Sequence, residues 1–267
     1  MRLAAALFVL IPLTAHAQPA DAALLDRVVG ALRVGQQAET ALASMQGRLG
    51  TSDRLFDPEA VADSVRARFR ADLRPDLLRD ALAHLQTPGY ARQLDRSRAL
   101  SQDPTALVRL SLGIDAPKKG SLADSALAAR YLDAAGTVRQ MTEILTRSMR
   151  AVVGTVPAAQ ADLDQRGQTA DEAIAETVAQ LNEQMAPLYL TSARVVLAGV
   201  PPAEVEAAIA YYASPAGQYV AEAFTEGTLA AVLPGIVQWV TGMASAPPPS
   251  VPAGSLAGPL PKPAGKP

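Results

Sequence analysis

The sequence contains no cysteine, and this absence excludes several kinds of chemistry at once. No disulfide can form, no thiolate can act as a nucleophile, and no N-terminal cysteine can carry a lipid. Histidine is scarce too, and His84 is its one copy outside the N-terminal apolar stretch. Serine–histidine relays, cysteine–histidine pairs and multi-histidine zinc sites therefore cannot be assembled in their usual forms. We expect no metal, no cofactor, no catalytic residue and no enzyme activity.

An excess of either charge is also lacking. Lys and Arg number 24, against 26 for Asp and Glu, which gives a net charge of −2. Nucleic-acid binding requires a basic stripe, which this balance does not favour. The sequence also has no glycine-rich loop of the kind that binds phosphate. Nucleic acid is therefore not an expected partner.

The N-terminus, "MRLAAALFVLIPLTAHAQ", has the pattern of a secretory signal peptide. One arginine precedes an apolar run of about ten residues, which ends in the small-x-small pattern Ala-His-Ala. A membrane span needs roughly 20 residues, so this run is too short, and an uncleaved anchor is the less favoured alternative. We expect residues 1–17 to be removed by cleavage before Gln18, which leaves an exported mature chain without a transmembrane span.

The C-terminal residues 244–267 are rich in Pro, Gly and Ser and have few apolar side chains. Such a segment cannot bury enough surface to offset the entropy lost on ordering. We expect a disordered, partly polyproline tail. It would act as a spacer, as a ligand for a peptide-binding module, or without a partner.

Between the two ends, apolar residues recur with a helical period, and no stretch alternates as a half-buried strand would. The pattern predicts one long helix over about 25–49, another over about 127–152, and a third over about 174–188. Pro187 indicates a kink or break in the third. The predicted fold class is all-α, a multi-helix bundle.

Two segments, 58–95 and 185–222, correspond at a constant offset of 127 residues. The matched positions include the pairs Pro75/Pro202, Ala81/Ala208, Ala83/Ala210, Thr87/Ser214 and Pro88/Pro215. A separate pairing upstream, Glu39 with Glu143, has an offset of 104, so the second copy has roughly 23 extra residues. We predict two related helical units, residues 18–115 and 116–243.

The dipeptides Thr87-Pro88 and Ser214-Pro215 mark the same boundary in both units. A residue before proline is pushed out of the helical region, so the preceding helix must end there. A Ser or Thr N-cap followed by Pro is also a favoured start for the next helix. We therefore expect two helices that meet at a capped corner in each unit.

The segment "PPAEVEAAIAYYASPAGQYVAEAF" resembles the core of domain-of-unknown-function family 2059, exported all-helical proteins of Gram-negative bacteria. The recurring phrase of that family is an aromatic-rich helix that ends in Ser-Pro-x-Gly, followed by Gln or Lys. The matching residues are Tyr211, Tyr212, Ser214, Pro215, Gly217 and Gln218. The resemblance covers about residues 185–240, and the first half is a diverged copy with Tyr90 in place of the glycine. It implies a periplasmic location and an all-helical body, but no known activity.

The second unit is the richer in aromatic residues, which favours either a core or a groove for an apolar ligand or partner helix. The candidate binding residues are Tyr211, Tyr212, Ser214, Pro215, Gly217, Gln218, Tyr219 and Trp239. The uncharged stretch 227–246 is consistent with a membrane helix or with a buried helix broken at Pro234. Pro234 and Gln238 favour the buried helix.

Two patterns of acidic residues have ordinary structural explanations. Residues 162–173 partly match a calcium loop but lack its final glutamate, and we expect an inter-helix loop in which Thr169 and Glu172 form a capping box. Glu204 and Glu206 lie at a predicted helix start, where acidic side chains are favourable. We expect a non-enzymatic periplasmic binding module whose ligand or partner is unknown, an apolar molecule or an envelope protein being the candidates. A structural, oligomerising envelope component is the alternative, and a carboxylate-only hydrolase is the least favoured.

Overall fold

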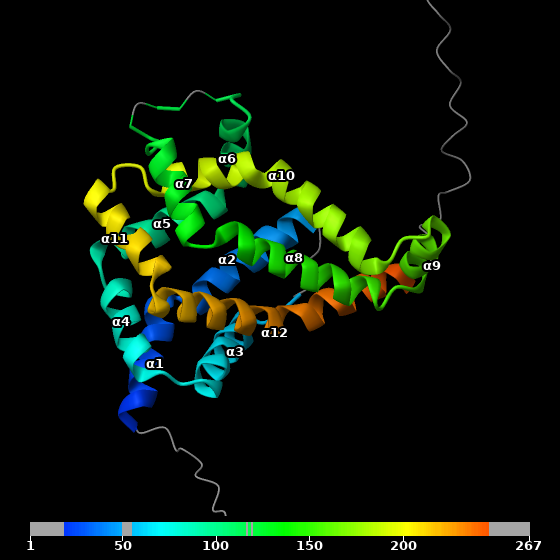
Figure 1. The fold of residues 1–267 in the computed structure, drawn as a ribbon, viewed down its shortest axis with the longest axis horizontal. Helices are drawn as coiled ribbons and strands as arrows, with labels where there is room; N and C mark the ends of the chain where they lie inside the picture. Colours follow the sequence, from blue (N-terminus) through cyan, green and yellow to red (C-terminus); the bar gives the residue numbers. More distant parts are fainter. Residues whose placement is uncertain (1–18, 50–54, 116, 119, 246–267) are drawn as a thin grey trace, which may run out of the picture.

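A computed structural model describes residues 19–49, 55–115, 117–118 and 120–245. The expected signal peptide and residues 246–267 of the expected tail lie outside the described residues. The described residues form helices and no strand, which confirms the all-α fold class (Figure 1). The helices are α1 (Pro19–Leu32), α2 (Val34–Leu49), α3 (Pro58–Ala71), α4 (Pro75–Leu85), α5 (Pro88–Gln102), α6 (Pro104–Ser111), α7 (Ser125–Ala134), α8 (Thr137–Val153), α9 (Pro157–Arg166), α10 (Ala170–Val196), α11 (Pro202–Ala213) and α12 (Pro215–Ser245).

Both predicted corners are present. Thr87 and Ser214 have extended backbones, and their hydroxyl oxygens accept hydrogen bonds from the backbone N–H groups of Tyr90 at 3.3 Å and Gly217 at 3.2 Å. The capping box also forms, since Thr169 and Glu172 each accept a hydrogen bond from the other's backbone N–H. Each of these caps satisfies backbone donors that a helix start leaves unpaired.

The two long helices predicted over 25–49 and 127–152 are each divided, and the division falls at equivalent places. Arg33, between α1 and α2, and Gly136, between α7 and α8, both have left-handed backbones, with φ of 51° and 63°. A single left-handed residue ends a helix without disturbing the apolar period on either side, so periodicity alone did not reveal it. These two residues are 103 apart, so the upstream offset of 104 predicted from Glu39 and Glu143 is one residue too long.

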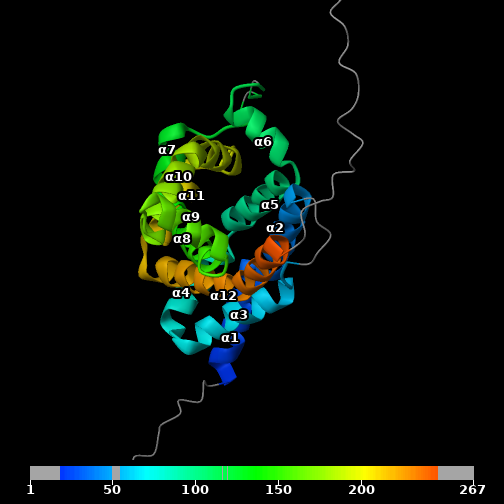
Figure 2. The ribbon, with the colours of Figure 1, turned by 90° about the vertical axis from the view of Figure 1, so that its right-hand side faces the viewer.

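The two units are built from corresponding helices: α1 with α7, α2 with α8, α4 with α11, and α5 with the first part of α12. Each unit also packs one helix against the other unit, and we call this reciprocal packing the exchange of α5 and α12. α5 packs against α10 and α11 of the second unit, and α12 packs against α3 and α4 of the first. In Figure 2, α2, α3 and α5 lie on one side, α8 and α10 on the other, and α12 runs between them. The exchange makes one interlocked body of the two units.

The hydrophobic core reflects this exchange. Its larger cluster combines buried residues of α1 to α5, including Val65 and Phe69, with Val220 and Ala223 of α12. A smaller cluster joins α7, α10 and α11 around Ala128, Leu197 and Val205. The first unit therefore does not bury its apolar faces alone, because its core includes residues of α12, whereas the smaller cluster consists of residues of the second unit.

α12 is a continuous helix that crosses α3 at close range. A Cβ on Gly227 would lie 2.5 Å from the Cα of Val65, so only glycine allows the two backbones this approach. The predicted break at Pro234 is wrong, and so is any break at Pro187, because both prolines lie inside unbroken helices. Both are exposed, so each ring faces solvent, where a gentle bend can accommodate it.

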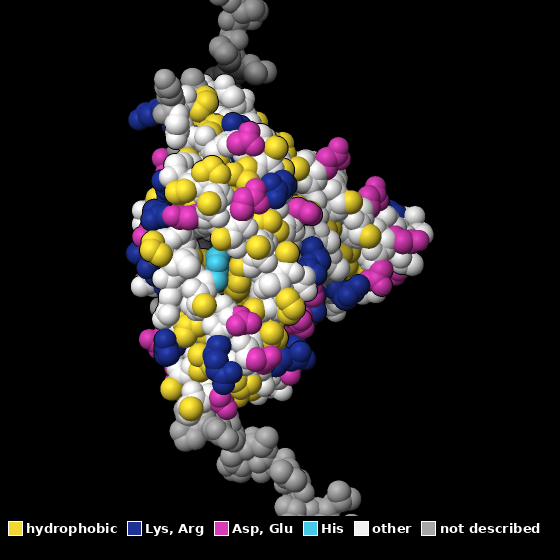
Figure 3. All heavy atoms as spheres, turned by 60° about the vertical axis from the view of Figure 1, so that its left-hand side comes forward, with side chains coloured by type: hydrophobic (Ala, Val, Ile, Leu, Met, Phe, Trp, Pro, Cys, Tyr) yellow, Lys and Arg dark blue, Asp and Glu magenta, His cyan; other side chains and the backbone are white. Residues whose placement is uncertain are grey.

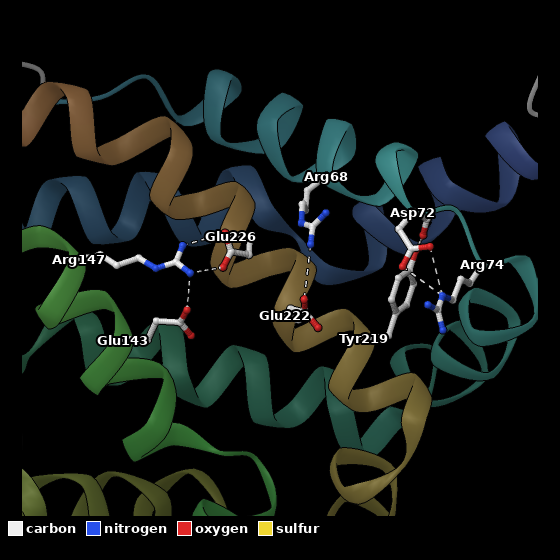
Figure 4. A network of polar contacts seen from close by, with 8 residues as sticks. All are labelled: Arg68, Asp72, Arg74, Glu143, Arg147, Tyr219, Glu222 and Glu226. Atoms are coloured by element: carbon white, nitrogen blue, oxygen red, sulfur yellow. Dashed lines mark hydrogen bonds and ion pairs between the residues drawn. The ribbon is translucent and has the colours of Figure 1, made fainter. Parts of the chain in front are cut away.

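Polar contacts hold the outer side of α12 to its neighbours (Figure 4). Glu222 pairs with Arg68 of α3 at 3.5 Å, and Glu226 pairs with Arg147 of α8 at 2.7 Å. By length and composition, α12 is also the one helix among the described residues that is apolar enough to cross a membrane, over Pro215–Gly242. A core helix of a folded domain passes the same test, so the expectation of no membrane span stays a prediction.

Candidate functional site

The site begins with a cluster of aromatic rings where the two units meet. The imidazole of His84 on α4 stacks on the ring of Tyr211 on α11, with centroids 3.9 Å apart and planes at 11°. Tyr212 extends the cluster, meeting Tyr131 of α7 edge to face at 5.5 Å. Tyr90 of α5 meets His84 at 5.7 Å. Rings in these edge-to-face and stacked arrangements attract one another beyond their buried area.

Next to these rings lies a cavity with two adjoining lobes of about 240 and 300 Å³, which we call the tyrosine cavity. The lobes share the lining residues Gln37, Tyr90, Tyr131, Thr137 and Tyr212. The first lobe is completed by Leu32, Leu85, Ala135, Gln140, Tyr211, Gly217, Val220, Ala221 and Phe224, and the second by Gln93, Leu94, Ser97, Leu132, Tyr189, Ser192, Ala193 and Val196. Both units therefore contribute to the wall.

Corresponding residues of the two units face this cavity, and all but one of the pairs, Gln37/Gln140, differ in size. The corresponding pairs in the wall are Leu32/Ala135, Gln37/Gln140, Leu85/Tyr212, Tyr90/Gly217, Leu94/Ala221 and Ser97/Phe224. Gly217 is required where it stands, because a side chain there would overlap the backbone carbonyl of Tyr211. The cavity is thus lined by corresponding positions of both units, and its unequal walls suit an unsymmetrical molecule.

Some polar atoms in the wall are paired and others are not. Gln37 and Gln140 each donate an amide N–H to the carbonyl five residues earlier, at 2.6 and 2.9 Å, which leaves their side-chain oxygens as acceptors. Tyr131 donates its hydroxyl to Gln93 at 3.2 Å. The hydroxyl of Tyr211 is buried and has no hydrogen-bond partner in the described part of the chain. A buried hydroxyl without a partner is costly, so Tyr211 offers an unused donor beside the cavity.

The wall of the tyrosine cavity contains no Asp, Glu, Lys, Arg or His. Burial raises the pKa of Tyr90, Tyr131, Tyr211 and Tyr212 above the usual value, so all four remain neutral phenols at physiological pH. Burial also lowers the pKa of His84 to about 4, which keeps the imidazole neutral. His84, cyan in Figure 3, is seen at the surface among mainly uncharged atoms. The site is therefore uncharged throughout.

A second, larger hollow adjoins the tyrosine cavity. This outer groove has a volume of about 630 Å³ and is lined by Ala129, Leu132, Asp133, Ala134, Gly136, Val138, Arg139, Ala186, Tyr189, Leu190, Ala213 and Gln218. Leu132 and Tyr189 belong to both walls, so they separate the two spaces. Small and apolar side chains dominate the groove.

The structure divides the predicted binding residues among different places. Tyr211, Tyr212 and Gly217 line the tyrosine cavity, and Gln218 lines the outer groove. Ser214 and Pro215 form the corner between α11 and α12, where the Ser214 hydroxyl also donates to the carbonyl of Tyr211 at 2.6 Å. This hydrogen bond ties the corner to the cavity wall.

Tyr219 and Trp239 lie elsewhere. Tyr219 donates its hydroxyl to the backbone carbonyl of Asp72 at 2.6 Å (Figure 4). Its ring also packs edge to face on Phe69. Trp239 is half-buried against the larger core cluster, in the second half of α12. Neither residue lines the tyrosine cavity or the outer groove, so both have structural surroundings.

Several wall residues were not among the predicted candidates, notably Gln37, Tyr90, Gln93, Tyr131 and Gln140. The signal that points to some of them is the repeat itself. Tyr90 occupies the position that corresponds to the candidate Gly217, and His84 corresponds to Tyr211. Applying the offset to every candidate would have brought Tyr90 into the predicted site.

The acidic residues are engaged in structural roles. Glu204 pairs with Arg92, Glu206 binds Arg130 through two hydrogen bonds of 2.7 Å, and Glu172 caps α10. No group of three or more acidic or histidine side chains suited to a metal ion occurs in the described ranges. Within 162–173, Asp164 lies in α9 and Glu172 in α10, so these two belong to helices rather than to one loop.

Comparisons with protein-family models, curated proteins and solved structures found no significant match to this chain. The resemblance of residues 185–240 to domain-of-unknown-function family 2059 therefore stays a prediction.

Proposed function

We propose that this chain is an exported, periplasmic, non-enzymatic protein that binds a small uncharged molecule in the tyrosine cavity. The observation that carries the proposal is the cavity itself: buried and half-buried tyrosines together with three glutamines at the junction of two units, without a charged side chain in the wall. Ligand sites commonly combine apolar and aromatic walls with a few polar groups that fix orientation. The expected export and the resemblance to an exported family support the location.

The chemistry of the wall indicates an aromatic ligand with a hydrogen-bonding substituent. Its ring would extend the existing arrangement of edge-to-face tyrosines. Its substituent would pair with the free hydroxyl of Tyr211 or with the side-chain oxygens of Gln37 and Gln140. A carboxylate or ammonium group would lose its hydration without gaining a counter-charge, which is strongly unfavourable.

Titration calorimetry with 4-methylphenol tests the proposal, with 4-hydroxybenzoate as the charged analogue. We expect the wild type to bind 4-methylphenol and to reject 4-hydroxybenzoate. Ala221 faces the cavity, so Ala221→Phe should fill the space and weaken binding by more than about tenfold. Ala230→Phe, on an exposed position of the same helix, is the matched control and should bind as the wild type does. Absence of binding to the wild type, or equal binding by both variants, would contradict the proposal.

A structural, oligomerising component is the second candidate, and one surface favours it. Val108, Leu112 and Ile114, on and after α6, are 43%, 69% and 65% exposed. Exposed large apolar residues close together in a chain are typical of protein–protein contacts. Under this alternative, light scattering shows a mass that rises with concentration, and Leu112→Ser returns it to that of a monomer. The tyrosine cavity has no carboxylate in its wall, so it lends no support to a carboxylate-only hydrolase.

A further inference from the structure

We infer that the ligand has two parts, an uncharged aromatic head in the tyrosine cavity and an aliphatic tail in the outer groove. This inference rests on the proposed function and adds the chemical class of the ligand. It starts from the position of Leu132 and Tyr189, which line both spaces. A molecule in the second lobe, of about 300 Å³, is therefore separated from the groove by these two side chains.

The two spaces differ in character, which is what a two-part ligand requires. The tyrosine cavity contains hydroxyl and amide groups from Thr137, Gln37 and Gln140. The outer groove instead has four alanines together with Leu132, Leu190 and Val138. Its charged residues, Asp133 and Arg139, are both exposed, so they can remain hydrated while the groove is occupied.

The groove also leaves apolar surface in contact with water. Val138 at the start of α8 is 46% exposed, and it is one of the few large hydrophobic side chains among the described residues with so much exposure. Leu132 and Leu190 pack only partly against the smaller core cluster. An aliphatic chain would cover this surface, and its gain would scale with the number of methylene groups buried.

The volumes agree with this division. A lobe of about 300 Å³ is at the lower limit for a ligand site, whereas the groove adds about 630 Å³. A one-ring molecule would fill this lobe and leave the outer groove open. The geometry thus points to an uncharged, alkyl-substituted aromatic amphiphile rather than a compact ligand.

A series of 4-alkylphenols with methyl, ethyl, butyl and hexyl chains tests the inference by calorimetry on the full-length mature protein. We expect Kd to fall by about fourfold for each added methylene. Ala186 is an exposed residue of the groove, and Ala186→Trp should remove this dependence on chain length while leaving 4-methylphenol binding unchanged. Ala207→Trp, on an exposed position of α11 outside the groove, is the matched control and should keep the dependence.

The outcomes separate the two proposals. Equal affinity across the series, or the same chain-length dependence in Ala186→Trp as in the wild type, would overturn the inference and leave the proposed function intact. Failure of every alkylphenol to bind would overturn both. Ala129→Trp, from the α7 side of the groove, serves as a second blocking variant, and thermal unfolding verifies that each variant is folded.

Discussion

His84 and Tyr211 occupy corresponding positions of the two units, and their rings stack on each other at 3.9 Å. Contact between a residue and its own counterpart is the mark of a two-fold axis, as in the interface of a symmetric dimer. The reciprocal packing of α5 on the second unit and α12 on the first follows the same symmetry. Both observations agree with the predicted organisation of two related helical units.

This organisation explains why the candidate site lies where it does. Dimer-like junctions place corresponding faces opposite each other, and a space remains wherever the facing residues do not fill it. Here Tyr90 corresponds to Gly217 and Leu85 to Tyr212, so a larger residue in one unit corresponds to a smaller residue in the other. The unequal residues at corresponding positions leave an uncharged cavity with unequal walls.

Removing the unpaired hydroxyl of Tyr211 should weaken ligand binding without lowering the stability of the fold. Tyr211→Phe deletes a buried hydroxyl without a partner, so we expect unchanged stability or a gain of up to about 1 kcal/mol, with weaker binding of 4-methylphenol. Tyr219→Phe deletes a hydroxyl that donates to Asp72, so it should lose about 1 kcal/mol and bind normally. Urea unfolding and calorimetry measure the two effects. A large loss of stability in Tyr211→Phe would show that its hydroxyl is satisfied.

The stability of the fold should depend on pH through His84. Burial lowers its pKa from 6.5 to about 4 in the folded protein, so the unfolded chain binds the proton more tightly. The stability that the neutral His84 ring contributes to the folded protein is therefore complete above pH 6.5 and is lost as the pH falls towards 4. Because the ring is partly exposed, we expect a loss of about 1–2 kcal/mol.

His84→Phe supplies the comparison for this prediction, since it keeps a ring beside Tyr211 but cannot titrate. The difference in unfolding free energy between wild type and variant should change between pH 6.5 and 4 and be constant above it. Parallel curves for the two proteins would show that His84 is protonated as easily in the folded state as in the unfolded one.

The two capped corners should contribute similarly to stability. Ser214→Ala and Thr87→Ala each remove an oxygen that accepts a hydrogen bond from a helix N-terminus, and each should cost about 1 kcal/mol. Ser214→Thr and Thr87→Ser retain the cap, so each should cost only a few tenths of a kcal/mol. Thermal unfolding measures all four. Equal stability of the alanine and hydroxyl variants would mean that proline alone fixes the corner.

The close crossing of α12 and α3 should be intolerant of a single methyl group. Gly227→Ala places a carbon against the backbone of Val65, which cannot move aside, so we expect a loss of about 1–3 kcal/mol or more. Gly242→Ala lies in open space on the same helix and should stabilise by about 0.5–1 kcal/mol through helix propensity. Denaturant midpoints compare them, and a neutral Gly227→Ala would show that the helices are further apart.

Local rules predicted the corners and caps from sequence, because they depend on a few adjacent residues such as Thr87 and Ser214. The same rules failed at Pro234, where a break was predicted, and Pro187 does not break its helix either, although a proline inside a helix costs about 3 kcal/mol. The packing of α10 and α12 against several other helices offsets that cost. Such packing involves residues far apart in the chain, which no local pattern records.

The site was predicted in part for a similar reason. Tyr211, Tyr212 and Gly217 were found through one motif, but Tyr90 reaches the cavity because α5 packs against the second unit, and Tyr131 because α7 packs against α11. Tyr219 was included for its aromatic character. It lies two residues from Gly217, whereas the cavity-facing residues Val220, Ala221 and Phe224 follow at helical spacing, so Tyr219 faces another side of α12.

Native mass spectrometry of the protein isolated from its own cell envelope tests the central claim most directly. The account predicts a bound, uncharged small molecule that wild type and Ala230→Phe retain and that Ala221→Phe, with its cavity filled, has lost. Wild-type protein that arrives free of any bound molecule, or a molecule retained equally by Ala221→Phe, would contradict the assignment of the tyrosine cavity as a binding site.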